Sequence, residues 1–144
     1  QVLDVYELLD RADASGEKNG KNTLRHLGAE EVEVTTIEGP KGKTDMIRVT
    51  IPGTNGKSAG GKAPTLGVLG RLGGLGARPE QIGFVSDGDG ALVALAVAAK
   101  LLDMKSKGDQ LEGDVVCCTH ICPDAPTSLI NRFHSWVHRL IWQQ

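Results

Sequence analysis

Aromatic residues are scarce in this sequence: Trp, Tyr and Phe together make up 3% of its 144 residues. The core of the fold must therefore be aliphatic, built from Val, Leu, Ile and Ala. The length suits one domain with a substantial core. The 19 glycines indicate many tight turns and favour a loop-rich α/β protein.

An excess of either charge and a long apolar segment are lacking as well. The net charge is −2, so we expect no basic face for nucleic acid or for an acidic membrane surface. No apolar run reaches the roughly 18–20 residues that a membrane span needs. Residues 1–10 are acidic and amphipathic, unlike a signal peptide, which favours a cytoplasmic protein. The chain does not begin with Met, which favours a fragment or a processed product.

The chain has only three cysteines, Cys117, Cys118 and Cys122. An odd number clustered within six positions does not form a disulfide framework, which favours a reducing compartment. Cys117 and Cys118 fall in an expected strand, where they would serve as small buried apolar residues. Cys122 follows that strand and is expected to be more exposed.

The stretch from residue 82 to residue 126 predicts a strand–helix–strand unit. An apolar strand over residues 82–85 ends in a Gly-rich turn, a helix covers residues 91–104, and a second strand covers residues 115–119. Ligands of open α/β sheets bind beyond the carboxyl ends of parallel strands. Polar side chains follow both strands here, so we expect a functional site at this edge.

Helices and a β-hairpin precede this unit. Hydrophobic periodicity predicts helices over residues 2–9 and 16–27. Ser15 would cap the second helix and Gly28 would end it. Strands are predicted over residues 32–36, 46–51 and 65–69. The first two strands form a hairpin around residues 39–43. The elements together predict an α/β fold with a mixed, mostly parallel sheet and helices on both faces, in three layers.

Asp87 and Asp89 stand two residues apart in the Gly-rich turn. Carboxylates in such a turn bind hard cations or act as bases. The simpler interpretation of Asp89 is a cap for the following helix.

His120, Cys122 and Asp124 alternate after the second strand and offer nitrogen, sulfur and oxygen ligands for zinc. Their spacing is no standard zinc signature, so an ordinary strand end with a satisfied His is the alternative.

Residues 53–58 read Gly-Thr-Asn-Gly-Lys-Ser and resemble the phosphate loop of the Mur ligase and folylpolyglutamate synthetase families. Such a loop needs a helix that begins within it, and residues 59–64, with two Gly and one Pro, do not favour one. A surface loop between strands is therefore the preferred interpretation. ATP binding through Lys57 is the alternative.

Residues 128–144 differ in character from the rest of the chain. They hold both tryptophans and apolar residues at helical spacing, so we divide the chain into an α/β domain, residues 1–127, and a divergent helical tail, residues 128–144. His134 and His138 lie four apart on this tail and are expected at its surface. A helix this apolar predicts a homo-oligomer.

Strings across residues 2–127, among them IPGTNGKSAGG, GFVSDGDGALVALA and THICPDAPT, resemble a prokaryotic protein family of unknown function. Members of that family are longer, so the chain resembles their N-terminal half, and the tail does not match them. The resemblance implies a truncated member with an incomplete active site.

The order of elements is more distantly similar to zinc-dependent exopeptidases and deacylases of the aminopeptidase and carboxypeptidase type. A Ser-Gly-Glu turn at residues 15–17, a hairpin and an Asp ahead of a small-residue helix carry this similarity. Arg71 stands where that family has a metal-binding His, so peptidase activity does not carry over. The resemblance implies a phosphorylase/hydrolase-like sandwich with a shifted divalent-metal site, for which zinc is the expected metal, at Asp87, Asp89, His120 and Asp124.

We therefore expect a metallohydrolase-like domain, similar to peptidases or amidohydrolases. The domain would be inactive if residues of the C-terminal half of longer family members are needed to complete its site. Its ligand would be a small molecule or a peptide, and the substrate-binding candidates are Arg71, Cys122 and Lys57. A non-catalytic domain that binds a small molecule or a protein partner is the alternative.

Overall fold

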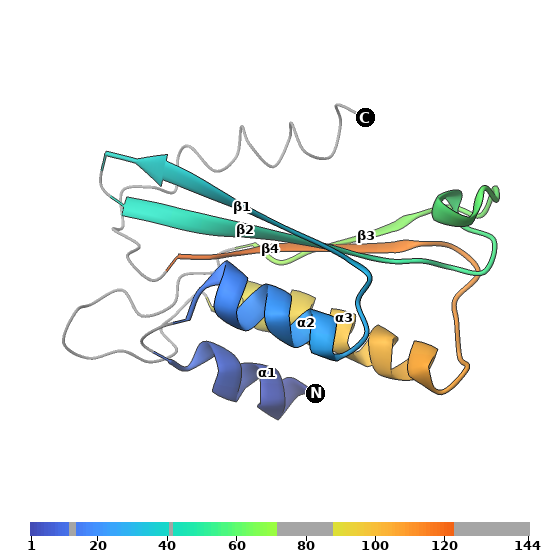
Figure 1. The fold of residues 1–144 in the computed structure, drawn as a ribbon, viewed down its shortest axis with the longest axis horizontal. Coiled ribbons are helices and arrows are strands. Elements are labelled where there is room, and N and C mark those ends of the chain that lie inside the picture. Colours follow the sequence, from blue (N-terminus) through green and yellow to red (C-terminus); the bar gives the residue numbers. More distant parts are fainter. Residues whose placement is uncertain (12–13, 41, 72–87, 123–144) are drawn as a thin grey trace.

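The computed structural model describes residues 1–11, 14–40, 42–71 and 88–122. Within these ranges four strands form one sheet, in the order β1 (Glu31–Gly39), β2 (Gly42–Ile51), β4 (Val115–Ile121) and β3 (Leu66–Leu69) (Figure 1). The α/β class and the mixed sheet predicted from the sequence are confirmed. The expected strand over residues 82–85 and the tail over residues 128–144 lie outside the described residues.

The predicted hairpin is formed by β1 and β2, which pair antiparallel along their whole length. Val32 pairs with Val49 and Val34 pairs with Ile47, so apolar side chains share the face that packs against the helices. The alternation of apolar and polar residues sets this register, because a slip by one residue would turn the apolar side chains toward solvent.

Strand β4 lies inside the sheet, antiparallel to β2 and parallel to β3. Two of the three described pairings are thus antiparallel, and the prediction of a mostly parallel sheet is wrong for this part of the chain. The reason is that the hairpin supplies two of the four strands and β4 runs against its inner strand. Among the described strands, only β3 and β4, which are joined through helix α3 (Asp89–Ser106), form a parallel pair.

Helix α3 and the helical segments of residues 2–9 and 16–26 all lie on one face of the sheet (Figure 1). Helix α3 packs against β4, and its small side chains Ala91, Ala94 and Ala98 are at most 1% exposed. Helix α1 (Val2–Leu9) packs against α3. A π-helical segment, η1 (Gly16–Lys21), packs against the hairpin and continues into α2 (Asn22–His26). The described residues therefore form two layers, and the predicted helical layer on the second face is not found among them.

The core is aliphatic, as the scarcity of aromatic residues predicts. Its most deeply buried large side chains are Leu9, Ile47, Val49, Val115 and Ile121. They come from α1, β2 and β4, so the interior strands and the helices share one core. Burial of such side chains stabilises the fold by about 1.5–3 kcal/mol each relative to exposure.

Turn residues set the helix ends where the sequence predicts them. Ser15 caps η1, because its Oγ accepts the backbone N–H of Lys18 at 3.1 Å. Gly28 follows α2 with a φ of 96°, the left-handed conformation in which helices commonly end. The predicted single helix over residues 16–27 differs in detail, since its first half is π-helical.

Candidate functional site at the carboxyl ends of β3 and β4

The carboxyl ends of β3 and β4 meet the first turn of α3. Gly70, directly after β3, donates its N–H to the carbonyl of Cys118 at 2.8 Å, and its own carbonyl accepts the Thr119 hydroxyl at 3.1 Å. A Cβ on Gly70 would lie 2.0 Å from the carbonyl oxygen of Gly90 in α3. The two glycines thus allow the backbones of β3 and α3 to approach at the edge where the sequence predicts a site.

His120 lies within β4 and not beyond its end, because the strand continues to Ile121. The side chain is 9% exposed. Its Nδ1 lies 3.1 Å from the Oγ1 of Thr44, and this hydroxyl also lies 3.2 Å from the carbonyl oxygen of Ile121. The imidazole of His120 is therefore held in a fixed direction between two antiparallel strands.

Burial lowers the pKa of His120 from 6.5 to about 4, because the charged imidazolium is poorly solvated in the interior. The ring is therefore neutral near pH 7. A neutral imidazole has one ring nitrogen with a lone pair that accepts a proton or binds a metal. The sequence pointed to His120 but not to Thr44, whose position is 76 residues away along the chain.

Cys122 is buried, so the prediction that it is exposed is wrong. Its thiol donates to the carbonyl oxygen of Lys43 at 3.4 Å, which extends the contact between β2 and the chain just beyond β4. The cause is the length of β4, which keeps Cys122 against the hairpin. Cys117 is buried and Cys118 is half-buried, as expected for residues of an interior strand, and none of the three cysteines forms a disulfide.

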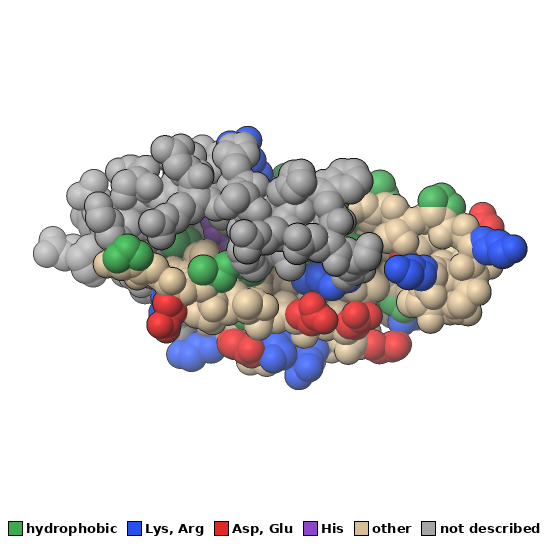
Figure 2. Space-filling model, turned by 90° about the horizontal axis from the view of Figure 1, so that it is seen from above, with side chains coloured by type: hydrophobic (Ala, Val, Ile, Leu, Met, Phe, Trp, Pro, Cys, Tyr) green, Lys and Arg blue, Asp and Glu red, His purple; other side chains and the backbone are tan. Residues whose placement is uncertain are grey.

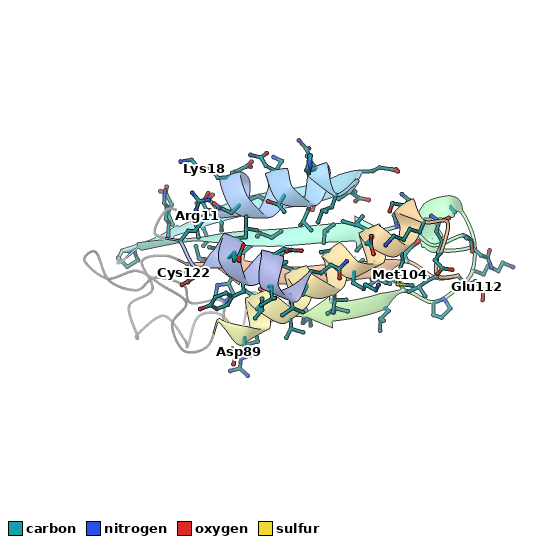
Figure 3. All side chains as sticks on the ribbon, turned by 90° about the horizontal axis from the view of Figure 1, so that it is seen from below. Arg11, Lys18, Asp89, Met104, Glu112 and Cys122 are labelled. Atoms are coloured by element: carbon teal, nitrogen blue, oxygen red, sulfur yellow. The ribbon has the colours of Figure 1, made fainter. Side chains whose placement is uncertain are left out.

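Asp89 is the first residue of α3 and is exposed. The residue that precedes the helix is Gly88, without a side-chain cap, so the interpretation of Asp89 as the helix cap is wrong. Its carboxylate in the first turn still interacts favourably with the helix dipole. Figure 3 places Asp89 and Cys122 at the same end of the molecule. The side chain of Arg71, the residue after Gly70, is exposed.

Two of the predicted metal ligands, Asp87 and Asp124, lie outside the described residues. Within residues 1–11, 14–40, 42–71 and 88–122, no three His, Cys, Asp or Glu side chains converge in a way that could hold a metal ion. Of the four predicted metal ligands, the described residues thus contain two: His120, held by Thr44, and Asp89 at the start of α3.

The loop over residues 53–58 closes around a carboxylate of its own chain. Asp114 Oδ1 accepts the Gly53 N–H at 2.9 Å and the Ser58 hydroxyl at 2.7 Å, and its Oδ2 accepts the Ser58 N–H at 2.8 Å. A single turn of 3-10 helix, η2 (Lys57–Ala59), begins within the loop and has only three residues, in place of the helix that a phosphate loop needs. The interpretation as a surface loop between strands is confirmed, and these donors are engaged by Asp114, not directed toward a phosphate.

Lys57 is exposed on this loop. The loop contacts Asp114, which precedes β4, whereas His120 is six residues further along the strand. At the rise of an extended strand, six residues span roughly 20 Å. The structure therefore does not bring Lys57 to the His120 edge.

The described surface gives little further sign of a ligand. One hollow lies at the opposite end of the sheet, and residues that line it include Ile51, Pro52, Leu111 and Val115. Figure 2 shows acidic and basic side chains side by side along one edge of the face in view. None of the helices in the described ranges has the length and apolar character needed to cross a membrane.

Comparison with family models matches residues 35–135 to the family described as "Protein of unknown function (DUF1177)". Neither the curated proteins nor the solved structures contain a match. The resemblance to a family of unknown function is thus supported, whereas the more distant resemblance to zinc-dependent exopeptidases finds no support in these comparisons.

Proposed function

Because that match spans more than half of the chain, the protein belongs to this family of unknown function, and we propose that it is a metallohydrolase-like domain. In this proposal His120 holds a divalent metal, zinc or manganese, through Nε2, the ring nitrogen that does not face Thr44. Asp87, Asp89 and Asp124 are the proposed oxygen ligands. The site would lie at the carboxyl edge of β3 and β4, where α/β sheets bind their ligands.

The observation that carries the proposal is the anchoring of His120. Metal-binding histidines usually have their second ring nitrogen held by a hydrogen bond, which fixes the ring direction and its tautomer. Thr44 holds Nδ1 of His120 at 3.1 Å, and burial keeps the ring in the neutral form that binds metals. An anchored, neutral imidazole at a strand end thus has the properties of a metal ligand.

A divalent metal at this position would supply Lewis acidity, either to polarise a carbonyl or to lower the pKa of a bound water. The chain itself would position the reactants. Arg71, exposed beside the start of α3, would bind a carboxylate or carbonyl oxygen of the substrate. The proposed substrates are therefore peptides and small amides, the compounds with a hydrolysable carbonyl that such a site would accept.

The test is elemental analysis of the full chain, purified without a His tag, with His120→Ala and Asp87→Ala variants. His26→Ala is the matched control, because His26 is exposed at the end of α2 and far from β4 in sequence. We expect stoichiometric zinc or manganese in the wild type and the control, and its loss in both site variants. Circular dichroism of all four proteins establishes that they are equally folded.

Absence of metal from the folded wild-type protein would contradict the proposal. The second candidate, a non-catalytic domain that binds a small molecule or a protein partner, would then be preferred. One observation favours it: the described residues contain no cluster of three metal ligands. ATP binding through Lys57 gains no such support, since Asp114 engages the donors of the Gly53–Ser58 loop.

A further inference from the structure

The hydrogen bonds around Thr44 restrict where the proton of the His120 ring can be. The Thr44 hydroxyl lies 3.2 Å from the carbonyl oxygen of Ile121 and 3.1 Å from Nδ1 of His120. A carbonyl oxygen can only accept a hydrogen bond, and a hydroxyl has a single proton to donate. If that proton is directed to Ile121, Nδ1 must be the donor in the second contact.

We infer that Thr44 fixes His120 in the tautomer that is protonated on Nδ1, and that Thr44 is a positioning residue for the candidate site. Nδ1–H of His120 donates to Thr44 Oγ1, and Thr44 Oγ1–H donates to the carbonyl of Ile121. In a neutral imidazole the other nitrogen, Nε2, then has the lone pair.

The register of the sheet explains why Thr44 can do this. His120 pairs with Met46, and Thr44 lies two residues before Met46 on the same face of β2. Diagonal neighbours of this kind lie within reach of each other across antiparallel strands. The pairing of Asp45 with Ile121 brings the Ile121 backbone to the same place, so one strand pairing supplies both partners of the hydroxyl.

The consequence for metal binding rests on the proposed function. If His120 is a metal ligand, Thr44 selects Nε2 as the nitrogen that binds. Removal of such a supporting hydrogen bond typically weakens metal binding about 10–100-fold. The tautomer itself does not depend on a metal and can be measured in metal-free protein.

The test is nitrogen-15 NMR of the full chain labelled in its histidine side chains, in the presence of a chelator, with His120→Gln to assign the signals. The variants are Thr44→Val, which keeps the shape but loses the hydroxyl, and Thr44→Ser, which keeps the hydroxyl. We expect Nδ1 to be protonated in the wild type and in Thr44→Ser. In Thr44→Val, the proton should move wholly or partly to Nε2.

Protonation of Nε2 in the wild type would overturn the inference, because Thr44 would then donate to Nδ1. An Nδ1-protonated ring that is unchanged in Thr44→Val would remove the positioning role of Thr44. If Thr44→Val does not fold, Thr44→Ala provides the same comparison. A wild-type chain that binds no metal but has the Nδ1-protonated ring would contradict the proposed function and leave this inference supported.

Discussion

Asp114 and Ser58 are joined by two hydrogen bonds across 56 residues of sequence: the Ser58 hydroxyl donates to Oδ1 at 2.7 Å and the Ser58 N–H donates to Oδ2 at 2.8 Å. With a third bond from Gly53 at 2.9 Å, the carboxylate ties the loop after β2 to the start of β4. A loop with the composition of a phosphate-binding loop thus encloses an internal anion, and this contact is structural.

Replacement of Asp114 by Asn should lower the free energy of unfolding by about 3 kcal/mol. The substitution removes the buried, charged acceptor of the hydrogen bonds from the loop, and it places the two N–H groups of the amide where the loop's own N–H and O–H groups already point. Urea unfolding followed by circular dichroism measures this change. Asp109→Asn is the control, since Asp109 is exposed just beyond α3 and should change stability by less than about 0.5 kcal/mol. Equal effects of the two substitutions would contradict the role of Asp114.

The stability that Asp114 provides should depend on pH. The hydrogen bonds from Gly53 and Ser58 lower the pKa of Asp114 below its ordinary value of 3.8, so the unfolded chain binds this proton more readily than the folded one. The contribution is therefore complete above the ordinary pKa and is lost as the pH falls through the lowered one. Urea unfolding of wild type and Asp114→Asn from about pH 6 to about pH 2 should show a difference that shrinks toward acid. A constant difference would mean that the carboxylate charge is not responsible.

Gly56 should not tolerate a side chain. A Cβ at this position would lie 1.9 Å from Asp114 Oδ1, so Gly56→Ala must displace the carboxylate from its donors. We expect a loss of about 2–3 kcal/mol, in the range of overpacked buried sites. Gly67→Ala is the matched control in β3, because a Cβ there meets nothing within 4 Å. A Gly56→Ala protein as stable as the control would show that the loop can move away from Asp114.

Cys117 should be nearly inert toward thiol reagents in the folded protein. Burial raises the pKa of its thiol to about 12. At pH 8 only about one thiol in ten thousand would be ionised, and the thiolate is the reactive form. In a Cys118→Ser, Cys122→Ser background, iodoacetamide should therefore label Cys117 about a thousandfold more slowly than after unfolding in urea. Rapid labelling of the native protein would indicate that β4 opens readily.

Local patterns were sufficient to predict most of the individual elements. The alternation around Val32 and Val49 located the hairpin, and the small-residue run after Gly90 located α3. Ser15 and Gly28 located helix ends because capping is determined by neighbours along the chain. Each of these signals acts within a few residues, where sequence reasoning is strongest.

The direction in which strands pair was not available from the same patterns. An apolar run such as residues 115–119 is compatible with a parallel or an antiparallel neighbour, and β4 has one of each. Its full length, to Ile121, depends on its pairing with Asp45 in β2. This extension explains why His120 and Cys122 are buried between strands and are not exposed after them.

The candidate site could be predicted only in part for the same reason. His120 was identified by its residue type and its place near a strand end. Thr44 was not, because nothing near residue 44 indicates a contact 76 residues away. Ser58 and Asp114 were likewise brought together by the fold, and the sequence around Ser58 predicted a surface loop without indicating its contact with Asp114.

The position of β4 between β2 and β3 has a consequence for the nascent chain. During translation, β1, β2 and β3 leave the ribosome before β4, yet β2 and β3 share no backbone bonds except through it. The hairpin can form early, but the inner edge of β2 must wait for residues 115–121. Unpaired strand edges attract other chains. The sheet should therefore be completed in one late step, and the interval before it is the period when newly made chains are most exposed to aggregation.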